Sequence, residues 1–554
     1  MAQNKDLEEK LAHIRREGEE RAAQRLAAKL KLKYLSLAKT PINVEALEFL
    51  PKEISEKSNV AVIQKLRDKI ALVAVNPESP ETKKVIKDLE SREFKVAVFV
   101  VSPSGFKYVF DYYKFVGEKA DEITGSFDIK KEAVAAADIN SIEKVKSILG
   151  KQIFLGSNAA IIFEIVLEAA MANRASDIHF EPSIENTKLR FRIDGILNDI
   201  FSFSNQFYPY LVSRIKLLSG LKLNINTETQ DGRFTIELAK KNVEVRVAVA
   251  PAQFGEVVVM RLLDPDAINI DLAELGLRKD DQAIIEAELK EPNGLILNTG
   301  PTGSGKTTTL YAFLKHVKSP EIKVITVEDP IEYQLQGIEQ TQVDEESGYT
   351  FANGLRSIMR QDPDVILVGE IRDKETAEIG IQAALTGHLV FSTVHANSAA
   401  GAIPRLTDLG VRPQSVGPAL NLIIAQRLVR RICQECKAPK QVDEELKTRI
   451  ENFLSKLPAR VNKNDYKEIR LFEPKGCNAC NKSGFKGRVA VYELLVFEPE
   501  MEELILKQVG ETAFQKFAVE KQMTTMQEDG ILKVISGITT FEEIESVTGA
   551  IHWK

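Results

Sequence analysis

The strongest chemical signal in the sequence is a phosphate-binding loop at residues 300–307, "GPTGSGKT". It fits G-x-x-x-x-G-K-[ST], a pattern in which glycines let backbone N–H groups turn inward around phosphates. In this pattern Lys306 supplies charge to the β- and γ-phosphates, and Thr307 supplies a hydroxyl to Mg²⁺. An apolar run, "GLILN", precedes the loop, and helix-forming residues follow it. The sequence therefore predicts an ATP site built from Gly300, Pro301, Thr302, Gly303, Ser304, Gly305, Lys306, Thr307 and Thr308.

Three further apolar runs end in residues that could act on a bound phosphate. "KVITV" is followed by Glu328, "VILVG" by Glu370, and "HLVFSTV" by His395. Because ligands bind at the carboxyl ends of strands in open parallel sheets, we expect these ends to converge with the loop. Glu370 is predicted to hold Mg²⁺ directly or through water. Glu328 is predicted to orient and deprotonate the attacking water, with Glu332 as the alternative.

His395 and two arginines are further candidates for contact with the phosphates. His395 either senses the γ-phosphate or is a hydrogen-bonded structural histidine. Arg356 and Arg360 are four residues apart in "LRSIMRQDPD", on one face of a helix that stops before Pro363. A correctly placed arginine accelerates phosphoryl transfer. The alternative is a pair of surface cations in weak salt bridges.

The four cysteines of the chain form two C-x-x-C pairs, Cys433 with Cys436 and Cys477 with Cys480. Two paired thiolates at this spacing are the ligand set of a tetrahedral Zn²⁺ site. Because four cysteines leave no open position on the metal, the predicted role is structural. A redox disulfide pair and four unrelated thiols are the alternatives.

Length and composition indicate a multidomain globular chain. With 554 residues it is too long for a single core, and its 44% hydrophobic and 28% charged residues are ordinary for a soluble protein. The net charge of −6 argues against a protein built to coat nucleic acid. The sequence shows neither a membrane span nor an apolar signal core, so we expect a cytosolic protein.

The hydrophobic pattern divides the chain into five segments. Strict alternation in "KLRFRIDG" and "VEVRVAVA" predicts antiparallel strands that carry arginines on their polar face. From about residue 268, strands alternate with helices, which predicts a parallel α/β core. The predicted segments are an amphipathic helical segment (1–32), a small α/β domain (33–120), a linker without an apolar strand (121–150), a second domain (151–266) and an ATPase domain (267–554) with the cysteine subdomain at 430–490.

Over residues 145–554 the chain resembles the ATPases that assemble type IV pili and type II secretion pseudopili. The motifs that carry this resemblance are "RASDIHFEP", "QDGRF", "GEVVVMRLL", the phosphate loop, "VEDPIEY", "LRSIMRQDPDVILVGEIRD", "ALTGHLVFSTVHAN", "QRLVRRICQECK" and "CNACNKSGFKGRVAVYELL". The resemblance implies an α/β fold, with a RecA-like P-loop motor domain and parallel-rich sheet. A PAS-like α+β domain and a small N-terminal α/β domain would precede it.

The resemblance also implies a function. The protein would be a homohexameric motor that hydrolyses ATP to drive type IV pilus extension through an inner-membrane platform protein. The alternative is a type II secretion ATPase that powers pseudopilus assembly. By motif, Arg233, Arg246 and Arg261 would reach the nucleotide, and Arg356 and Arg360 would meet the phosphates from the motor domain or a neighbouring subunit. The extra N-terminal domain and the tetracysteine site separate this group from the retraction motors.

The resemblance places the protein in the cytoplasm, recruited to the inner face of the membrane without spanning it. Relatives that bind cyclic di-GMP carry Arg-Leu-Gly near the start, whereas Ala27 stands at the glycine position here, which argues against that ligand. A nucleic-acid translocase would show a basic stripe or a stacking platform, and this acidic chain has 7% aromatic residues. A non-hydrolysing switch is disfavoured because both carboxylates and several arginines are present.

Overall fold

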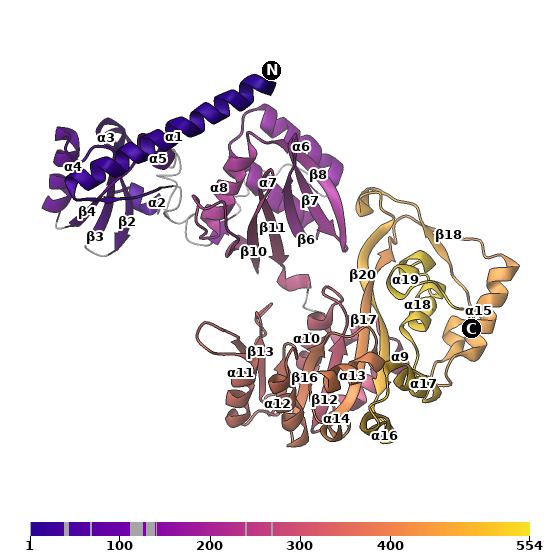
Figure 1. Cartoon of the computed structure of the whole chain (residues 1–554). Helices are drawn as coiled ribbons and strands as arrows, with labels where there is room; N and C mark the ends of the chain where they lie inside the picture. The colour runs from indigo at the N-terminus through magenta and orange to yellow at the C-terminus, as the bar shows by residue number, and fades with distance from the viewer. Residues whose placement is uncertain are drawn as a thin grey trace. The chain divides into compact units, whose positions relative to one another are not determined.

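The computed structural model describes residues 2–37, 44–66, 69–92, 94–110, 113, 126–128, 139, 141–238, 241–267 and 270–553. The chain divides into two compact units (Figure 1). The first unit comprises residues 1–139 and 143–262, and the second comprises residues 140–142 and 263–554. Among the described residues, no helix is both long enough and apolar enough to cross a membrane.

The N-terminal part of the first unit is the small α/β domain that the sequence predicts. Its sheet has the order β1-β4-β3-β2, with β1 and β3 parallel to β4 and β2 antiparallel to β3. The strands are β1 (Lys33–Tyr34), β2 (Val60–Leu66), β3 (Lys69–Ala74) and β4 (Lys95–Val100). The helices are α1 (Ala2–Leu30), α2 (Val44–Leu47), α3 (Lys52–Ser58), α4 (Pro80–Ser91) and α5 (Pro103–Phe110). The charge-rich N-terminal segment is thus a single helix.

The second part of the first unit is a seven-stranded sheet with the order β5-β9-β10-β11-β6-β7-β8. Its strands are β5 (Ser126–Asp128), β6 (Ala175–Pro182), β7 (Asn186–Ile193), β8 (Ile196–Ser204), β9 (Gln230–Leu238), β10 (Lys241–Ala252) and β11 (Gly255–Leu263). Its helices are α6 (Ile142–Phe154), α7 (Ala159–Ala172) and α8 (Tyr208–Leu218). The predicted antiparallel pairing is confirmed for β7 and β10. The alternation has its expected effect, because Leu189, Phe191 and Val245 are buried.

Two elements lie inside the predicted linker, 121–150, most of which falls outside the described residues. Strand β5 pairs in parallel with β9, with Phe127 opposite Ile236, although the sequence pattern predicts no strand there. A three-residue edge strand is too short to give a periodic signal, which explains why the pattern misses it. Helix α6 begins at Ile142, in keeping with a linker that contains some helix.

The second unit contains the predicted parallel α/β core. Its sheet has the order β14-β13-β15-β16-β12-β17-β20, and every neighbouring pair is parallel except β17 with β20. The strands are β12 (Gly294–Thr299), β13 (Val324–Glu328), β14 (Glu339–Gln342), β15 (Val365–Val368), β16 (Leu389–Val394), β17 (Leu420–Ile432) and β20 (Phe485–Val496). Every residue of β12, β13, β15 and β16 is buried or nearly so, as in a sheet covered on both faces.

Two layers of helices cover this sheet. Residues such as Leu295 and Leu297 pack on one side with helices α11–α14, whereas Ile296 packs on the other side with α9 and α10. The helices of the two layers are α9 (Lys279–Glu288), α10 (Lys306–Val317), α11 (Phe351–Ile358), α12 (Lys374–Leu385), α13 (Ala399–Asp408) and α14 (Pro413–Ala419).

The C-terminal part of the second unit is built on the long strands β17 and β20. Figure 1 shows these strands extending beyond the rest of the sheet, with α18 and α19 beside them. This part contains α15 (Glu444–Lys456), α16 (Met501–Leu506), α17 (Glu511–Glu520), α18 (Met526–Ile535) and α19 (Phe541–Thr548). Strands β18 (Lys437–Pro439) and β19 (Phe472–Pro474) form a separate antiparallel pair.

A buried ion cluster joins these helices to the sheet and to the start of α9. Asp529 of α18 is fully buried and accepts from Arg278 (2.7 Å) and Lys533 (2.5 Å). Its second oxygen also accepts the backbone N–H of Tyr492 on β20, at 2.8 Å. These partners hold the pKa of Asp529 below its usual value despite its burial, with the Lys533 charge as the largest favourable contribution.

Neutralising this carboxylate should destabilise the second unit. We expect Asp529→Asn to lower the free energy of unfolding by about 3–5 kcal/mol, because it leaves Lys533 buried without its counter-charge and removes one of the three carboxylates that pair with Arg278. Urea unfolding can be followed by the fluorescence of Trp553, which packs against Phe453 and Phe541 in this part of the chain. Glu503→Gln, which removes an exposed ion pair, is the control and should leave the midpoint unchanged. An equal effect of both changes would contradict a special role for the cluster.

Candidate functional site

The phosphate loop leads from the end of β12 to the start of α10, as the sequence predicts. Gly300, Gly303 and Gly305 have φ values of 151°, 79° and 91°, which favour glycine. A Cβ atom at Gly300 would lie 2.6 Å from the backbone oxygen of Gln426, whereas one at Gly303 would meet nothing within 4 Å. The loop is therefore packed against β17 at Gly300 and open at Gly303.

The loop has unmet capacity to bind an anion. The Lys306 ammonium donates to the backbone oxygens of Gly300 (2.8 Å) and Pro301 (3.2 Å), within the loop itself. Among the described residues the buried Ser304 hydroxyl has no hydrogen-bond partner. Burial lowers the pKa of Lys306, and the nearby Arg427 adds to this effect, while Glu370 opposes it. Because the N-terminus of α10 also favours negative charge, these residues fit the phosphates of a nucleotide.

All four predicted strand ends lie at one edge of the sheet, in the order β13-β15-β16-β12, and the side chains of Glu370 and His395 meet there. In the sheet, β16 lies between β12 and β15, so His395 follows the strand that separates the phosphate loop from Glu370. The His395 Nε2 atom lies 3.5 Å from a Glu370 oxygen. The Thr299 hydroxyl at the end of β12 accepts the N–H of Ala396 and donates to its carbonyl oxygen, at 2.8 and 2.9 Å. These hydrogen bonds fix the loop after His395 to the strand that leads into the phosphate loop.

Glu328 occupies a different environment from Glu370. Its side chain is 4% exposed and accepts hydrogen bonds from Tyr311 (2.5 Å), Thr326 (2.6 Å) and Gln340 (3.1 Å). Burial and the Glu328 carboxylate both raise the pKa of Tyr311, which keeps its hydroxyl a donor. A carboxylate with three protein donors and almost no exposure is poorly placed to meet an attacking water.

Glu332, the alternative to Glu328, lies half-buried in the loop that follows β13. Gln340 supports this loop, donating to the backbone oxygen of Tyr333 (2.9 Å) and accepting the N–H of Leu335 (2.6 Å). The same Gln340 amide also donates to Glu328. Glu328 therefore belongs to the network that fixes the loop carrying Glu332.

The two arginines of "LRSIMRQDPD" lie on a helix and on its short extension. Arg356 is in α11, which ends at Ile358, and Arg360 is in the 3₁₀ turn that runs from Met359 to Gln361. Arg356 binds Glu375 of α12 and Asn353 of its own helix, whereas Arg360 is exposed. The hydrogen bonds and ion pairs of Arg356 in this chain are thus to α11 and α12 and not to the phosphate loop.

The three arginines of the first unit share one face of its sheet. Arg233, Arg246 and Arg261 lie on the consecutive strands β9, β10 and β11 and alternate with buried residues. Arg233 and Arg246 stand directly opposite each other in the antiparallel register. Arg261 pairs with Asp177 at 3.0 Å, and Arg246 lies 3.6 Å from Glu244. Like charges directly opposite one another destabilise a sheet, so this face would gain from an anionic ligand.

Arg372 is a residue of the site that the sequence reasoning missed. It contacts Glu370 and lies 3.5 Å from Asp329, which follows Glu328 at the end of β13. Hydrogen bonding to Glu370 raises the pKa of Arg372. The available signal was its position two residues after Glu370 in "GEIRD".

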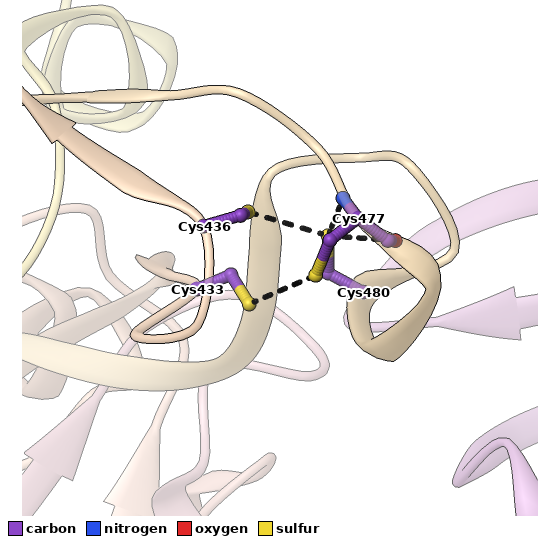
Figure 2. Close-up of side chains that lie close together, drawn as sticks. All are labelled: Cys433, Cys436, Cys477 and Cys480. Carbon is purple, nitrogen blue, oxygen red and sulfur yellow. Dashed lines mark hydrogen bonds between the residues drawn. The ribbon is translucent and has the colours of Figure 1, made fainter.

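The four cysteines form one compact cluster, as the sequence predicts. Figure 2 shows the two pairs facing each other, from the turn after β17 and from the turn before β20. Three sulfur–sulfur distances are 3.7 Å (Cys477–Cys480), 3.8 Å (Cys436–Cys480) and 3.9 Å (Cys433–Cys477). A Zn–S bond of about 2.3 Å gives tetrahedral edges of about 3.8 Å, so this spacing fits a four-thiolate zinc site.

The backbone around the cluster also fits a thiolate site. The Cys480 sulfur accepts N–H groups from Cys477 (3.1 Å) and Gly484 (3.3 Å). Although burial raises it, these donors hold the pKa of the Cys480 thiol down to about 7. A Cβ atom at Gly484 would lie 2.4 Å from Pro474, which explains the glycine at this turn.

Comparison with known proteins gives a consistent result. Residues 156–546 match the model of the family described as "Type II/IV secretion system protein". The chain is 38% identical over 520 residues to "Type II secretion system protein E" of Dickeya dadantii (strain 3937), covering 92% of this chain and 99% of that protein. It is 34% identical over 515 residues to "Type IV pilus assembly ATPase PilB" of Myxococcus xanthus (strain DK1622), covering 92% and 88%.

Two further similarities concern the core and the fold. The "Type II secretion system ATPase E" of Vibrio cholerae (serotype O1, strain ATCC 39315 / El Tor Inaba N16961) is 43% identical over 387 residues, covering 70% of this chain and 75% of that protein. The X-ray structure of the Yersinia pseudotuberculosis ATPase DotB covers 70% of this chain and 93% of its own, with a TM-score of 0.51 at 20% identity. This last likeness supports the fold.

The role of Glu328 can be tested through stability. We expect Glu328→Gln to lower the free energy of unfolding by about 1.5–3 kcal/mol, because charge-assisted hydrogen bonds from Tyr311 and Thr326 are lost. Nucleotide affinity should stay near that of the wild type, since the hydrogen-bond partners of Glu328 (Tyr311, Thr326 and Gln340) lie outside the phosphate loop. Thermal unfolding and titration with a fluorescent ADP would measure the two effects. A variant with unchanged stability and no ATP turnover would instead identify Glu328 as the base.

Proposed function

The chain belongs to the Type II/IV secretion system protein family, and we propose that it is the hexameric motor ATPase of a pilus or pseudopilus assembly machine. Its second unit is a RecA-like P-loop domain. The observation that carries the proposal is the meeting of Lys306, Glu370 and His395 beside one phosphate loop. This arrangement supplies the positive charge, the carboxylate and the polar side chain that ATP hydrolysis requires.

We propose a role for each site residue of the second unit. Lys306 and the N–H groups of the loop hold the β- and γ-phosphates, and the N-terminus of α10 adds its positive end. Bound Mg²⁺ would neutralise charge that develops on the phosphates, and Thr307 and Glu370 are the residues to hold it. Glu370 is also held by Arg372 and faces His395, so its carboxylate is fixed in orientation.

We propose Glu332 as the group that orients and deprotonates the attacking water. Glu328 is buried and occupied by three donors, and it shares Gln340 with the loop that carries Glu332. A candidate base must come within hydrogen-bond reach of the water, which a carboxylate on the loop can do and one inside the core cannot.

The remaining arginines would act on the same nucleotide from elsewhere. Arg233, Arg246 and Arg261 present a row of cations on one face of the first unit. Arg356 and Arg360 are on the surface of the motor unit, so in a ring they could reach the site of a neighbouring subunit. A hexamer would place such cations at each nucleotide. We therefore propose that the ring, rather than the single chain, is the active form.

The partners that we propose are those that the resemblance to pilus and secretion assembly ATPases implies. We propose that the ring acts at the inner face of the cytoplasmic membrane on a platform protein that adds pilin-like subunits to a fibre. Pilus and pseudopilus motors share every motif quoted above, and pilus extension is our first candidate on overall likeness. Pseudopilus assembly is the second candidate, and it is supported by the higher full-length identity to a type II secretion protein, 38% over 520 residues against 34% over 515 for the pilus relative.

We also propose that the four cysteines hold structural Zn²⁺, on the basis of the sulfur spacing. We expect Cys477→Ser to lose the metal that the wild type retains, as measured by inductively coupled plasma mass spectrometry after purification without added metal. Asn478→Ala, an exposed change between two ligands, is the control and should keep the zinc. Metal-free wild-type protein with four free thiols and unchanged thermal stability would contradict the site.

ATP turnover tests the motor itself. We expect Lys306→Ala to reduce steady-state ATPase activity roughly 10²–10³-fold, and Glu332→Gln roughly 10²–10⁴-fold while ATP binding is kept. Activity, nucleotide affinity and oligomeric mass would be measured on the same preparations. A ring that binds ATP without turnover would make the protein a switch, and turnover that depends on DNA would make it a translocase.

The two assembly machines can be distinguished in the source bacterium. Replacement of the native gene by the Lys306→Ala form should abolish either surface pili, seen by electron microscopy, or the export of extracellular proteins, seen by mass spectrometry of the medium. If the Lys306→Ala strain kept both its pili and its protein export, the assembly proposal would be contradicted, even if the purified wild-type protein hydrolyses ATP.

A further inference from the structure

Strand β17 is the neighbour of β12 on the side away from β16, β15 and β13, the strands that end at His395, Glu370 and Glu328. The parallel register places Thr299, the last residue of β12, opposite Ala425 of β17. The next two residues of β17, Gln426 and Arg427, therefore run alongside the loop that begins at Gly300. Neither residue belongs to a phosphate-binding motif of the sequence.

Gln426 joins the phosphate loop to strand β12 through its side-chain amide. Its side chain is 1% exposed, and its amide nitrogen donates to the backbone oxygen of Ser304 at 2.7 Å. Its amide oxygen accepts from the Asn298 side chain of β12 at 2.8 Å. A Cβ atom at Gly305 would lie 3.0 Å from the Gln426 amide nitrogen, which shows how closely the loop is packed here. Gln426 thus connects β12 to the far side of the loop.

Arg427 places a second cation beside Lys306. One guanidinium nitrogen lies 3.2 Å from the position of a Cβ atom at Gly300 and donates to the Gln426 carbonyl oxygen at 3.1 Å. The other donates to the backbone oxygen of Asn397 at 3.0 Å, in the loop that carries His395. These contacts are to neutral oxygens, and the carboxylate of Glu493 is the acidic group whose charge it feels.

Two cations beside a loop of N–H donors are stabilised by a polyanion. Arg427 disfavours the charged form of Lys306, and this repulsion would be relieved when phosphate oxygens enter the loop. The guanidinium is also fixed by two backbone oxygens, so little side-chain entropy would be lost on contact with an anion.

We propose that Gln426 and Arg427 belong to the nucleotide site. Gln426 is a positioning residue that holds the phosphate loop in its binding shape through Ser304. Arg427 is a phosphate-binding residue that also ties the bound nucleotide to the loop after His395. The inference rests on the proposed ATPase function for its biological meaning, whereas the binding itself is tested with ADP and pyrophosphate.

The test of Arg427 compares three variants by competition with a fluorescent ADP. Arg427→Ala should weaken the binding of ADP and of pyrophosphate by the same factor, roughly ten- to a hundredfold, because one charge-assisted contact to phosphate is lost. Arg427→Lys should recover part of this loss, since it keeps the charge. Arg431→Ala, an exposed arginine of the same strand, is the matched control and should bind as the wild type.

Two results would overturn the role of Arg427. One is unchanged affinity of Arg427→Ala for both ligands. The other is equal weakening in the Ala and Lys variants together with a lowered thermal midpoint of the free protein, which would show a structural tie between β17 and Asn397. If the wild type binds ADP but does not hydrolyse ATP, the proposed function fails while this comparison still decides the role of Arg427.

Gln426 is tested by Gln426→Glu, which cannot donate to the Ser304 oxygen and adds a negative charge near the phosphates. We expect ADP affinity to fall at least roughly tenfold. Gln382→Glu, an exposed change on α12 that adds the same charge elsewhere in the second unit, is the control and should bind normally. Equal ADP affinity in both variants would overturn the positioning role.

Discussion

The site depends on the parallel hydrogen-bond ladder that places β16 between β12 and β15. Parallel strands end at the same edge of a sheet, so the phosphate loop, His395 and Glu370 meet although about 70 residues separate the loop from Glu370 in the chain. The ladder is possible because each of these strands is buried on both faces by helices. A polar residue in place of Ile296 of β12 or Phe391 of β16, both fully buried, would weaken the sheet and the site together.

Much of this arrangement could be predicted from short-range signals. The phosphate loop and the paired cysteines have fixed spacings set by their ligands, and the structure places them as those spacings require. The alternation in β7 and β10 also predicted an antiparallel sheet, because burial of one face alone imposes a period of two on the sequence. Strand β5 gave no such signal, since three residues at a sheet edge carry no period.

Our proposal of Glu332 in place of Glu328 as the base could not be made from the sequence. Both Glu328 and Glu332 follow an apolar strand, so strand-end logic alone cannot choose between them. The choice depends on Tyr311 and Gln340, which come from α10 and β14 and reach Glu328 only through the fold. Gln426 and Arg427 begin the motif "QRLVRRICQECK", but sequence reasoning assigned them no role at the phosphates, for a related reason. Their relation to the phosphate loop is set by the register of β12 with β17, over more than 120 residues of chain.

A single buried carboxylate links the nucleotide edge of the sheet to the C-terminal helices. Glu493 of β20 accepts the N–H of Ala399 at the start of α13 (2.9 Å) and that of Met526 at the start of α18 (3.3 Å). Burial raises the pKa of Glu493, and the two helix N-termini oppose that effect because they favour its charged form. Helix α13 begins four residues after His395. The loop after His395 and helix α18 are therefore both held by Glu493. A shift of either helix start would lose a charge-assisted hydrogen bond that water cannot replace, because the carboxylate is buried.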